Sequence, residues 1–135
     1  MPTPLSKLKG VSPELANKFK ELGLTTSNQL LAVAGTPAGR DLLVAQVNED
    51  PGLVSSLIKR ADLLRIEGIG EVYVELLEEA GIDSIQQLAS ASPEALYAEI
   101  MKVNITNKMT QRPPTLTKVR RWVAQAAQLP KIVQY

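Results

Sequence analysis

Four positions in this sequence place a short polar residue directly before proline, and this pattern constrains the fold more than any other feature. The pairs are Ser12-Pro13, Thr36-Pro37, Asp50-Pro51 and Ser92-Pro93. A serine, threonine or aspartate side chain can accept a hydrogen bond from an unpaired N–H of the first helical turn, and a proline at the first helical position has no N–H to leave unpaired. Each pair therefore predicts the start of a helix.

Glycines that follow apolar-periodic runs predict where several helices end. Gly23, Gly35 and Gly81 stand where a left-handed residue would close a helix. The combined pattern predicts helices over residues 13–22, 27–34, 37–47, 51–65, 71–80, 84–90, 93–103 and 115–128. No segment alternates apolar and polar residues with β-branched enrichment, so we expect an all-α fold. The polar stretch 104–115 is the one extended loop that the pattern predicts, and we expect it to be mobile.

The sequence also repeats itself with an offset of 58 residues. Residues 10–31 align with residues 68–89, and the identical pairs are Gly10/Gly68, Glu21/Glu79, Gly23/Gly81, Gln29/Gln87 and Leu30/Leu88. After a two-residue slip, Thr36-Pro37 aligns with Ser92-Pro93, and Val47-Asn48 with Val103-Asn104. The helix that closes the first half aligns with the one that closes the second, with Leu57 opposite Trp122. Units this small bury little apolar surface alone, so we expect residues 1–61 and 62–135 to pack as one pseudo-symmetric domain.

A glycine-containing turn lies between two predicted helices at the start of the second half. In the string ADLLRIEGIGEVYVELLEEAGI, residues 61–82, the turn Gly68-Ile69-Gly70 precedes a helix with apolar residues on one face. Together with the EAGIDSIQQLA run and the closing RPPTLTKVRRWVAQAAQL helix, it resembles a family of unknown function. Members of that family are duplicated helix-hairpin-helix proteins, frequent in photosynthetic bacteria. The resemblance implies two tandem helix-hairpin-helix (SAM-like) units; relatives of this hairpin include DNA-binding modules and protein-docking subunits.

Charge is strongly segregated along the chain, although the net charge is only +1. Residues 1–48 carry a balance of +2, residues 49–101 carry −8, and residues 102–135 carry +7 with no acidic residue. Such segregation predicts charged surface patches. We expect the acidic and basic regions either to pair with each other, within one chain or between copies, or to bind partners of opposite charge.

The composition argues against an enzyme and against a membrane-spanning protein. Histidine and cysteine are both absent, which removes the commonest general base, the thiolate nucleophile and the usual zinc ligands. We assign no catalytic residue, metal ligand, cofactor or small-molecule substrate, and we interpret Glu71, Glu75 and Glu78 as a solvated helix face. No apolar run approaches the roughly 20 residues that span a bilayer, and the N-terminus lacks the pattern of a signal peptide. These features predict a cytoplasmic protein.

Our preferred hypothesis is a protein-docking module whose partner binds an acidic face around the second hairpin. DNA-binding hairpins favour a basic residue after the second glycine, whereas here Gly70 is followed by Glu71. The carboxylates of this hairpin would repel phosphate but would attract a basic protein surface. The residues that we expect at this face are Glu67, Gly68, Ile69, Gly70, Glu71, Glu75 and Glu78.

The alternative hypothesis is weak, sequence-independent binding of DNA or RNA through basic residues. The candidates are Lys7, Lys9, Gly10, Lys18 and Lys20 at the first hairpin, and Lys118, Arg120 and Arg121 on the closing helix. In the first hairpin Ser12 replaces the second glycine, and we expect it to cap the helix. Trp122 could stack on a base, but its alignment with Leu57 predicts that it is buried. Binding of the basic closing helix to a membrane surface is a weaker third hypothesis.

Overall fold

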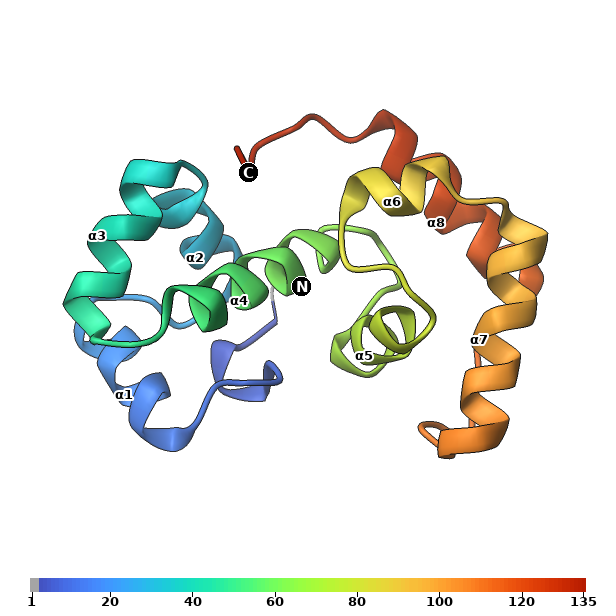
Figure 1. Ribbon diagram of the computed structural model, residues 1–135, viewed down its shortest axis with the longest axis horizontal. Coiled ribbons are helices and arrows are strands. Elements are labelled where there is room, and N and C mark those ends of the chain that lie inside the picture. The colour runs from blue at the N-terminus through green and yellow to red at the C-terminus, as the bar shows by residue number, and fades with distance from the viewer. Residues whose placement is uncertain (1–2) are drawn as a thin grey trace. The chain divides into compact units, whose positions relative to one another are not determined.

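The computed structural model describes residues 3–135, and this part of the chain is all-α, as predicted (Figure 1). Met1 and Pro2, which belong to the N-terminal segment and the first predicted half, lie outside the described residues. The elements are η1 (Leu5–Lys7), α1 (Pro13–Glu21), α2 (Ser27–Ala34), α3 (Pro37–Val47), α4 (Pro51–Leu63), α5 (Glu71–Glu79), α6 (Ile85–Ser90), α7 (Pro93–Asn107) and α8 (Leu116–Gln128). Within residues 3–135 the only β-type pairing is an isolated bridge between Pro4 and Thr26.

All four predicted helix starts at capping residue–proline pairs are confirmed. The side chain of Ser12 accepts a hydrogen bond from the N–H of Leu15 at 3.1 Å, and each of the other three capping side chains likewise accepts an N–H of its helix. Helix α2 begins with a full capping box, in which Thr26 and Gln29 satisfy each other's backbone N–H. The caps therefore fix where these helices begin before any tertiary packing is considered.

The predicted end of the helix over 93–103 is wrong, because α7 continues for one more turn to Asn107. Asn104 was expected to lie in the loop, as the counterpart of Asn48, which ends α3 in the left-handed conformation. Instead, its side chain donates to the carbonyl of Thr110 at 3.0 Å and accepts from the N–H of Thr110 at 2.9 Å. These two bonds tie down the chain beyond the helix, and the left-handed residue that ends α7 is Lys108.

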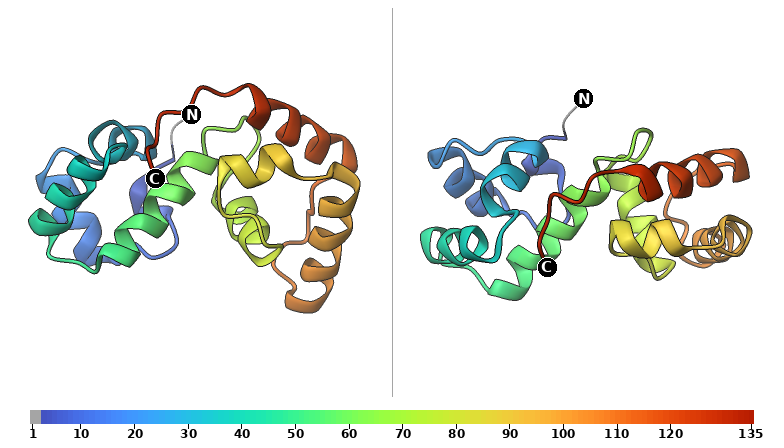
Figure 2. Two further views of the ribbon diagram at one scale, coloured as in Figure 1. Left: turned by 45° about the horizontal axis from the view of Figure 1, so that its top comes forward. Right: turned by 90° about the horizontal axis from the view of Figure 1, so that it is seen from above.

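The chain forms two compact units. Unit 1 comprises Met1–Leu64 together with Lys131–Tyr135, and unit 2 comprises Arg65–Pro130. In unit 1, α2 packs against α3 and α4, and α1 packs against α3. In unit 2, α8 packs against α6 and α7, and α5 packs against α7 (Figure 2). Each unit has its own core of buried aliphatic side chains, with Phe19 the aromatic residue of the first core and Trp122 that of the second.

In each unit, the helix that closes the repeat packs beneath a glycine held at positive φ. Gly10 has a φ of 95°, and a Cβ placed on it would stand 3.2 Å from Leu53 and 3.5 Å from Leu57 of α4. Gly68 has a φ of 92°, and a Cβ placed on it would stand 3.3 Å from the indole nitrogen of Trp122 on α8. The predicted burial of Trp122 is confirmed, since it is only 2% exposed. A bare backbone at these two turns lets the helix below approach closely.

The turns that end α1 and α5 also share their hydrogen bonds. Leu24 donates to the carbonyl of Phe19 at 2.8 Å, and Ile82 donates to the carbonyl of Leu77 at 2.8 Å. Both turns contain a glycine at positive φ, with 79° at Gly23 and 96° at Gly81. An L-residue at such a φ is strained by the contact of its Cβ with its own backbone.

We predict that Gly81→Ala lowers the free energy of unfolding by about 1–2 kcal/mol, from backbone strain alone. No neighbouring atom lies within 4 Å of the position that the new methyl group would take, so packing adds nothing to the cost. The matched control is Gly52→Ala in the first turn of α4, where φ is not positive and the nearest atom is 3.6 Å away. This control should be neutral or stabilise the protein. Urea unfolding followed by circular dichroism measures both, and equal effects of the two substitutions would contradict the prediction.

Candidate functional site

The sequence-predicted site residues fall into both units. Those of the first hairpin, Lys7, Lys9, Gly10, Lys18 and Lys20, belong to unit 1. Those of the second hairpin and of the closing helix belong to unit 2. Unit 2 therefore holds an acidic group and a basic group of candidates in one compact body, together with a pocket beside the Gly68 turn.

In unit 1, one of the predicted lysines has partners within the chain. The ammonium group of Lys18 donates to the carbonyl of Val47 at 2.8 Å and lies 3.7 Å from a carboxylate oxygen of Glu49. Lys18 thus holds the end of α3 to the end of α1. Lys7, Lys9 and Lys20 are exposed. Their exposure fits the alternative hypothesis, in which Lys18 stays a candidate because its side chain is 43% exposed.

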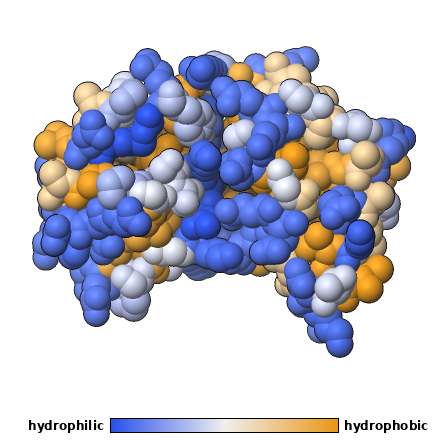
Figure 3. All heavy atoms as spheres, viewed as in Figure 1, coloured by the Kyte–Doolittle hydropathy of each residue, from blue (hydrophilic) through white to orange (hydrophobic). Residues whose placement is uncertain are grey.

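Helix α5 carries the carboxylates of the candidate acidic face. At 100° per residue, Glu71, Glu75, Glu78 and Glu79 fall with Val72 in one arc of about 120° around this helix. Val74, Leu76 and Leu77 occupy the remaining side and are buried. Glu79 is exposed, and the other three carboxylates are partly exposed. In Figure 3, hydrophilic atoms cover the side of α5 that is turned to the viewer. We call the solvent-facing arc of Glu71, Glu75 and Glu79 the acidic face.

The other residues predicted around this face have different surroundings. Glu67 is exposed, and its backbone N–H donates to the side-chain oxygen of Gln125 at 2.6 Å. The side chain of Ile69 is only 5% exposed and lies in the core, so only the backbone of this residue is left for the predicted contact with a partner. Gly68 and Gly70 line the pocket beside α5.

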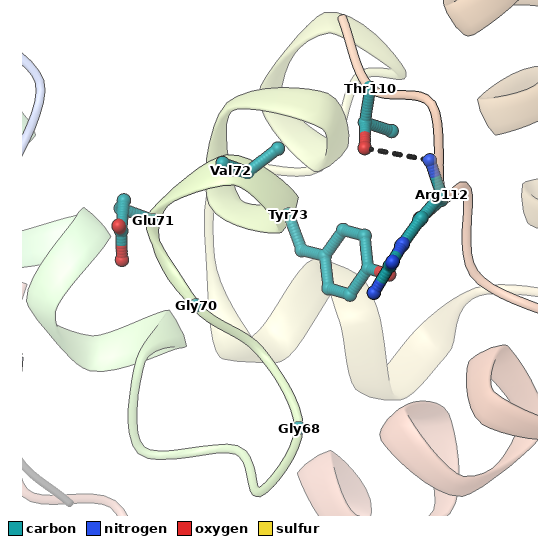
Figure 4. Close-up of a pocket in the computed structure, with 7 residues that line it drawn as sticks. All are labelled: Gly68, Gly70, Glu71, Val72, Tyr73, Thr110 and Arg112. Atoms are coloured by element: carbon teal, nitrogen blue, oxygen red, sulfur yellow. Dashed lines mark hydrogen bonds between the residues drawn. The ribbon is translucent and has the colours of Figure 1, made fainter.

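That pocket has a volume of about 330 Å³ and lies at the N-terminus of α5 (Figure 4). Besides the two glycines it is lined by Glu71, Val72, Tyr73, Thr110 and Arg112. Gly70 has no side chain to cap α5, whereas its counterpart Ser12 caps α1. The N–H groups of the first turn of α5 therefore receive no side-chain acceptor from the cap residue.

Sequence reasoning missed Tyr73, Thr110 and Arg112 as pocket residues. The Tyr73 hydroxyl donates to the backbone carbonyl of Arg112 at 2.7 Å, and the Arg112 N–H donates to the Thr110 hydroxyl at 3.1 Å. These bonds bring the loop after α7 to α5, and Figure 4 shows the side chain of Glu71 on the opposite side of the helix from Arg112. The tyrosine ring also packs against Trp122, with ring centroids 5.3 Å apart.

The basic residues of α8 differ in how they are paired. Arg120 forms an ion pair with Glu94 of α7 at 3.0 Å, and both side chains are more than half exposed. No partner of Lys118 or Arg121 is found among residues 3–135, and both are exposed. Lys118 and Arg121 lie one helical turn before Trp122 and Gln125, whose side chains meet the Gly68 turn. These two cations therefore project on the same side of α8 as that turn.

The pKa of the Glu94 carboxyl is lowered, first by hydrogen bonding to the backbone at the start of α7 and second by the Arg120 side chain. A lowered pKa means that folding favours the charged carboxylate. The charged carboxylate of Glu94 therefore adds to the free energy of unfolding. This contribution is complete at pH values above the pKa that Glu94 has in the unfolded chain, and it is lost as the pH falls through the lower pKa of the folded state.

Two absences concern the part of the chain that the structure describes. No three of its aspartate and glutamate side chains group as a metal would require. No helix over residues 3–135 is both long and apolar enough to cross a membrane.

We predict that Arg120→Ala raises the pKa of Glu94 only part of the way to its ordinary value, because the larger cause, the backbone hydrogen bond, remains. The control is Arg121→Ala, which removes a neighbouring cation without a partner and should leave that pKa unchanged. An NMR titration of the Glu94 side-chain carboxyl measures both variants. A complete return to the ordinary value in Arg120→Ala would show that the ion pair, and not the backbone, sets the pKa.

The comparisons with known proteins identify the family but no characterised relative. No curated protein and no solved structure matches the chain. One family model matches residues 9–129, which cover both units from the Gly10 turn to the end of α8. The chain therefore belongs to the family described as Domain of unknown function (DUF4332).

Proposed function

We propose that this chain is a non-enzymatic docking module, built from two tandem helix-hairpin-helix units, that binds a basic surface of another protein through the acidic face of α5. The observation that carries the proposal is the set of carboxylates on the solvent-facing arc of that helix. Glu71, Glu75 and Glu79 have no ion-pair partner among residues 3–135. Three neighbouring carboxylates repel one another, so a cationic partner surface is favoured.

The neighbouring basic helix supports this interpretation. Because Arg120 of α8 forms its ion pair with Glu94 of α7, its guanidinium does not neutralise the carboxylates of α5. The acidic face therefore keeps its charge for an external ligand. Val72, which is 42% exposed at the edge of this arc, adds an apolar contact of the kind found inside protein interfaces.

The helix-hairpin-helix assignment rests on the sequence resemblance and on features that recur in the same order in the two units. These features are the positive φ of Gly10 and Gly68, the helix packed beneath each of them, and the equal hydrogen bonds after α1 and α5. Hairpins of this kind act as rigid platforms whose surface charge selects the partner. In unit 2 the charge of the helix after the hairpin is negative, which favours protein over nucleic acid.

We predict that the double variant Glu71→Lys/Glu75→Lys loses its cellular protein partner while it keeps its fold. Reversal of two charges at the centre of the acidic face should weaken binding about tenfold or more, because attraction becomes repulsion. Affinity capture from the native organism, compared with wild type by quantitative mass spectrometry, gives the readout.

The matched control is Glu14→Lys/Glu21→Lys, which makes the same change in net charge on two exposed carboxylates of α1. Proteins that are lost with the α5 variant and retained with the α1 variant are bound through the acidic face. If both variants retain every partner of the wild type, the proposed docking face is wrong.

The second candidate function, binding of a nucleic-acid backbone, is favoured by donors that converge on the Gly68 turn. Lys118 and Arg121 lie on the same side of α8, and the first turn of α5 adds backbone N–H groups. Cations beside backbone donors suit a phosphate group.

If nucleic acid is the ligand, Lys118→Glu/Arg121→Glu should abolish binding to labelled DNA of any sequence. Milder replacement of both residues by Gln should lower the slope of log affinity against log salt by roughly two released counterions. Fluorescence anisotropy at low and physiological salt measures both effects. The control is Lys102→Glu/Lys108→Glu on two exposed lysines of α7 and its end, which lie outside the candidate residues and change the charge equally. Equal losses in the two charge-reversal variants would show only a general charge effect.

A further inference from the structure

The last five residues of the chain belong to unit 1, and they are bound there as an extended peptide. Segment Lys131–Tyr135 has no regular secondary structure. The side chain of Val133 is 1% exposed and joins the core cluster of unit 1, whereas the preceding Ile132 is 48% exposed. Figures 1 and 2 draw this segment at the red end of the chain. One side chain enters the core and its neighbour faces solvent, as in a strand.

The backbone of this segment is held at the corner between α2 and α3. The N–H of Gln134 donates to the carbonyl of Gly35 at 2.7 Å. The guanidinium of Arg40 bridges two carbonyls, because it donates to Ala34 at 3.1 Å and also to Gln134. A Cβ placed on Gly35 would stand 2.8 Å from the carbonyl oxygen of Ile132, so only glycine allows this close approach.

A third contact lies at the end of the segment. The hydroxyl of Tyr135 donates to a carboxylate oxygen of Asp62 at 3.1 Å, and Asp62 is only 3% exposed. We call Gly35, Arg40, Asp62 and the core space that receives Val133 the tail site. Main-chain hydrogen bonds with a pocket for every second side chain are the usual means by which a protein captures an extended peptide.

We propose that the tail site also accepts segment 131–135 of a second copy, so that the chain associates with itself by tail exchange. Each of these contacts joins the tail to unit 1 alone, and an identical tail from another copy can make all of them. The segment has no regular secondary structure and is held by one buried side chain and a few polar contacts. Such segments open locally at a much lower cost than global unfolding.

The concentration at which exchange occurs follows from the tether. In one chain, the tail competes for its own site at an effective concentration on the order of 1 mM. Wild-type protein should therefore remain monomeric well below that concentration. Exchange becomes visible at lower concentrations once a free tail and an empty tail site are provided on different copies.

Two variants provide the available tail and the empty tail site on different copies of the chain. Val133→Asp puts a charge on the buried tail residue, and this empties the tail site of its own chain. Arg40→Ala removes the guanidinium that holds Gln134, and this weakens the binding of an intact tail to its own site. We predict that each variant alone is monomeric at about 0.1 mM, a tenth of the effective concentration, and that an equimolar mixture forms a complex of two chains. Size-exclusion chromatography with light scattering measures the mass.

The matched control is Ile132→Asp, which adds the same charge one residue earlier on the exposed side of the tail. This chain should keep its own tail bound, so its mixture with Arg40→Ala should stay monomeric. Monomers in the Val133→Asp mixture, with both variants folded by circular dichroism, overturn the proposal. The same is true if Ile132→Asp forms the complex equally well, since the buried position would then carry no specificity.

A second tail variant keeps the experiment decisive if Val133→Asp does not fold. If Val133→Asp loses the helical circular dichroism of the wild type, Gln134→Pro takes its place, because proline removes the N–H that donates to Gly35. The same mixture with Arg40→Ala then decides the outcome. A labelled peptide of sequence Lys-Ile-Val-Gln-Tyr should also bind the tail-disrupted chain, and failure of that peptide to bind contradicts a peptide-accepting tail site.

Discussion

The close packing of a helix beneath a positive-φ glycine is the constraint on which each unit depends. Without a side chain, Gly10 lets α4 approach the first turn and Gly68 lets Trp122 of α8 lie under the second. Polar contacts then fasten the turns: Arg60 of α4 donates to the carbonyl of Lys9 at 2.7 Å, and Gln125 of α8 accepts the N–H of Glu67. Arg60 and Gln125 thus bind the backbone of the glycine turn at matching positions of the two units. This correspondence supports the proposal that the two units are repeats.

The fastened turns determine which charges face solvent in unit 2. Because the apolar side of α5 faces the core, its carboxylates lie on the solvent side of the helix, and the turn before α5 holds the helix in this orientation. The packing of Trp122 likewise directs Lys118 and Arg121 to one side of α8. The positions of the acidic face and of these basic residues therefore follow from the packing of the core, and the proposal of a basic protein partner rests on the larger number of carboxylates without partners.

Most of the fold could be predicted from the sequence, because local chemistry specifies it. The capping residue–proline pairs determine the helix starts, and the alignment of Trp122 with Leu57 predicts its burial correctly. The end of α7 was not predictable, since an asparagine can close a helix or, as Asn104 does, bind a later loop. Contacts between residues far apart in the sequence could not be predicted either, because local patterns do not specify them. Examples are the hydrogen bond from Lys18 to Val47, the position of Arg112 at the pocket and the packing of Val133 into the core of unit 1.

The central claim, that α5 presents a docking face for a basic protein, is tested most directly by zero-length carbodiimide cross-linking in native cell extract. This reagent joins a carboxylate to a lysine only where the two already form an ion pair, and mass spectrometry identifies the linked residues. The account predicts cross-links from Glu71, Glu75 or Glu79 to lysines of one other protein. Cross-links to other proteins that arise only from carboxylates elsewhere on the chain, with these three glutamates unmodified, would contradict it.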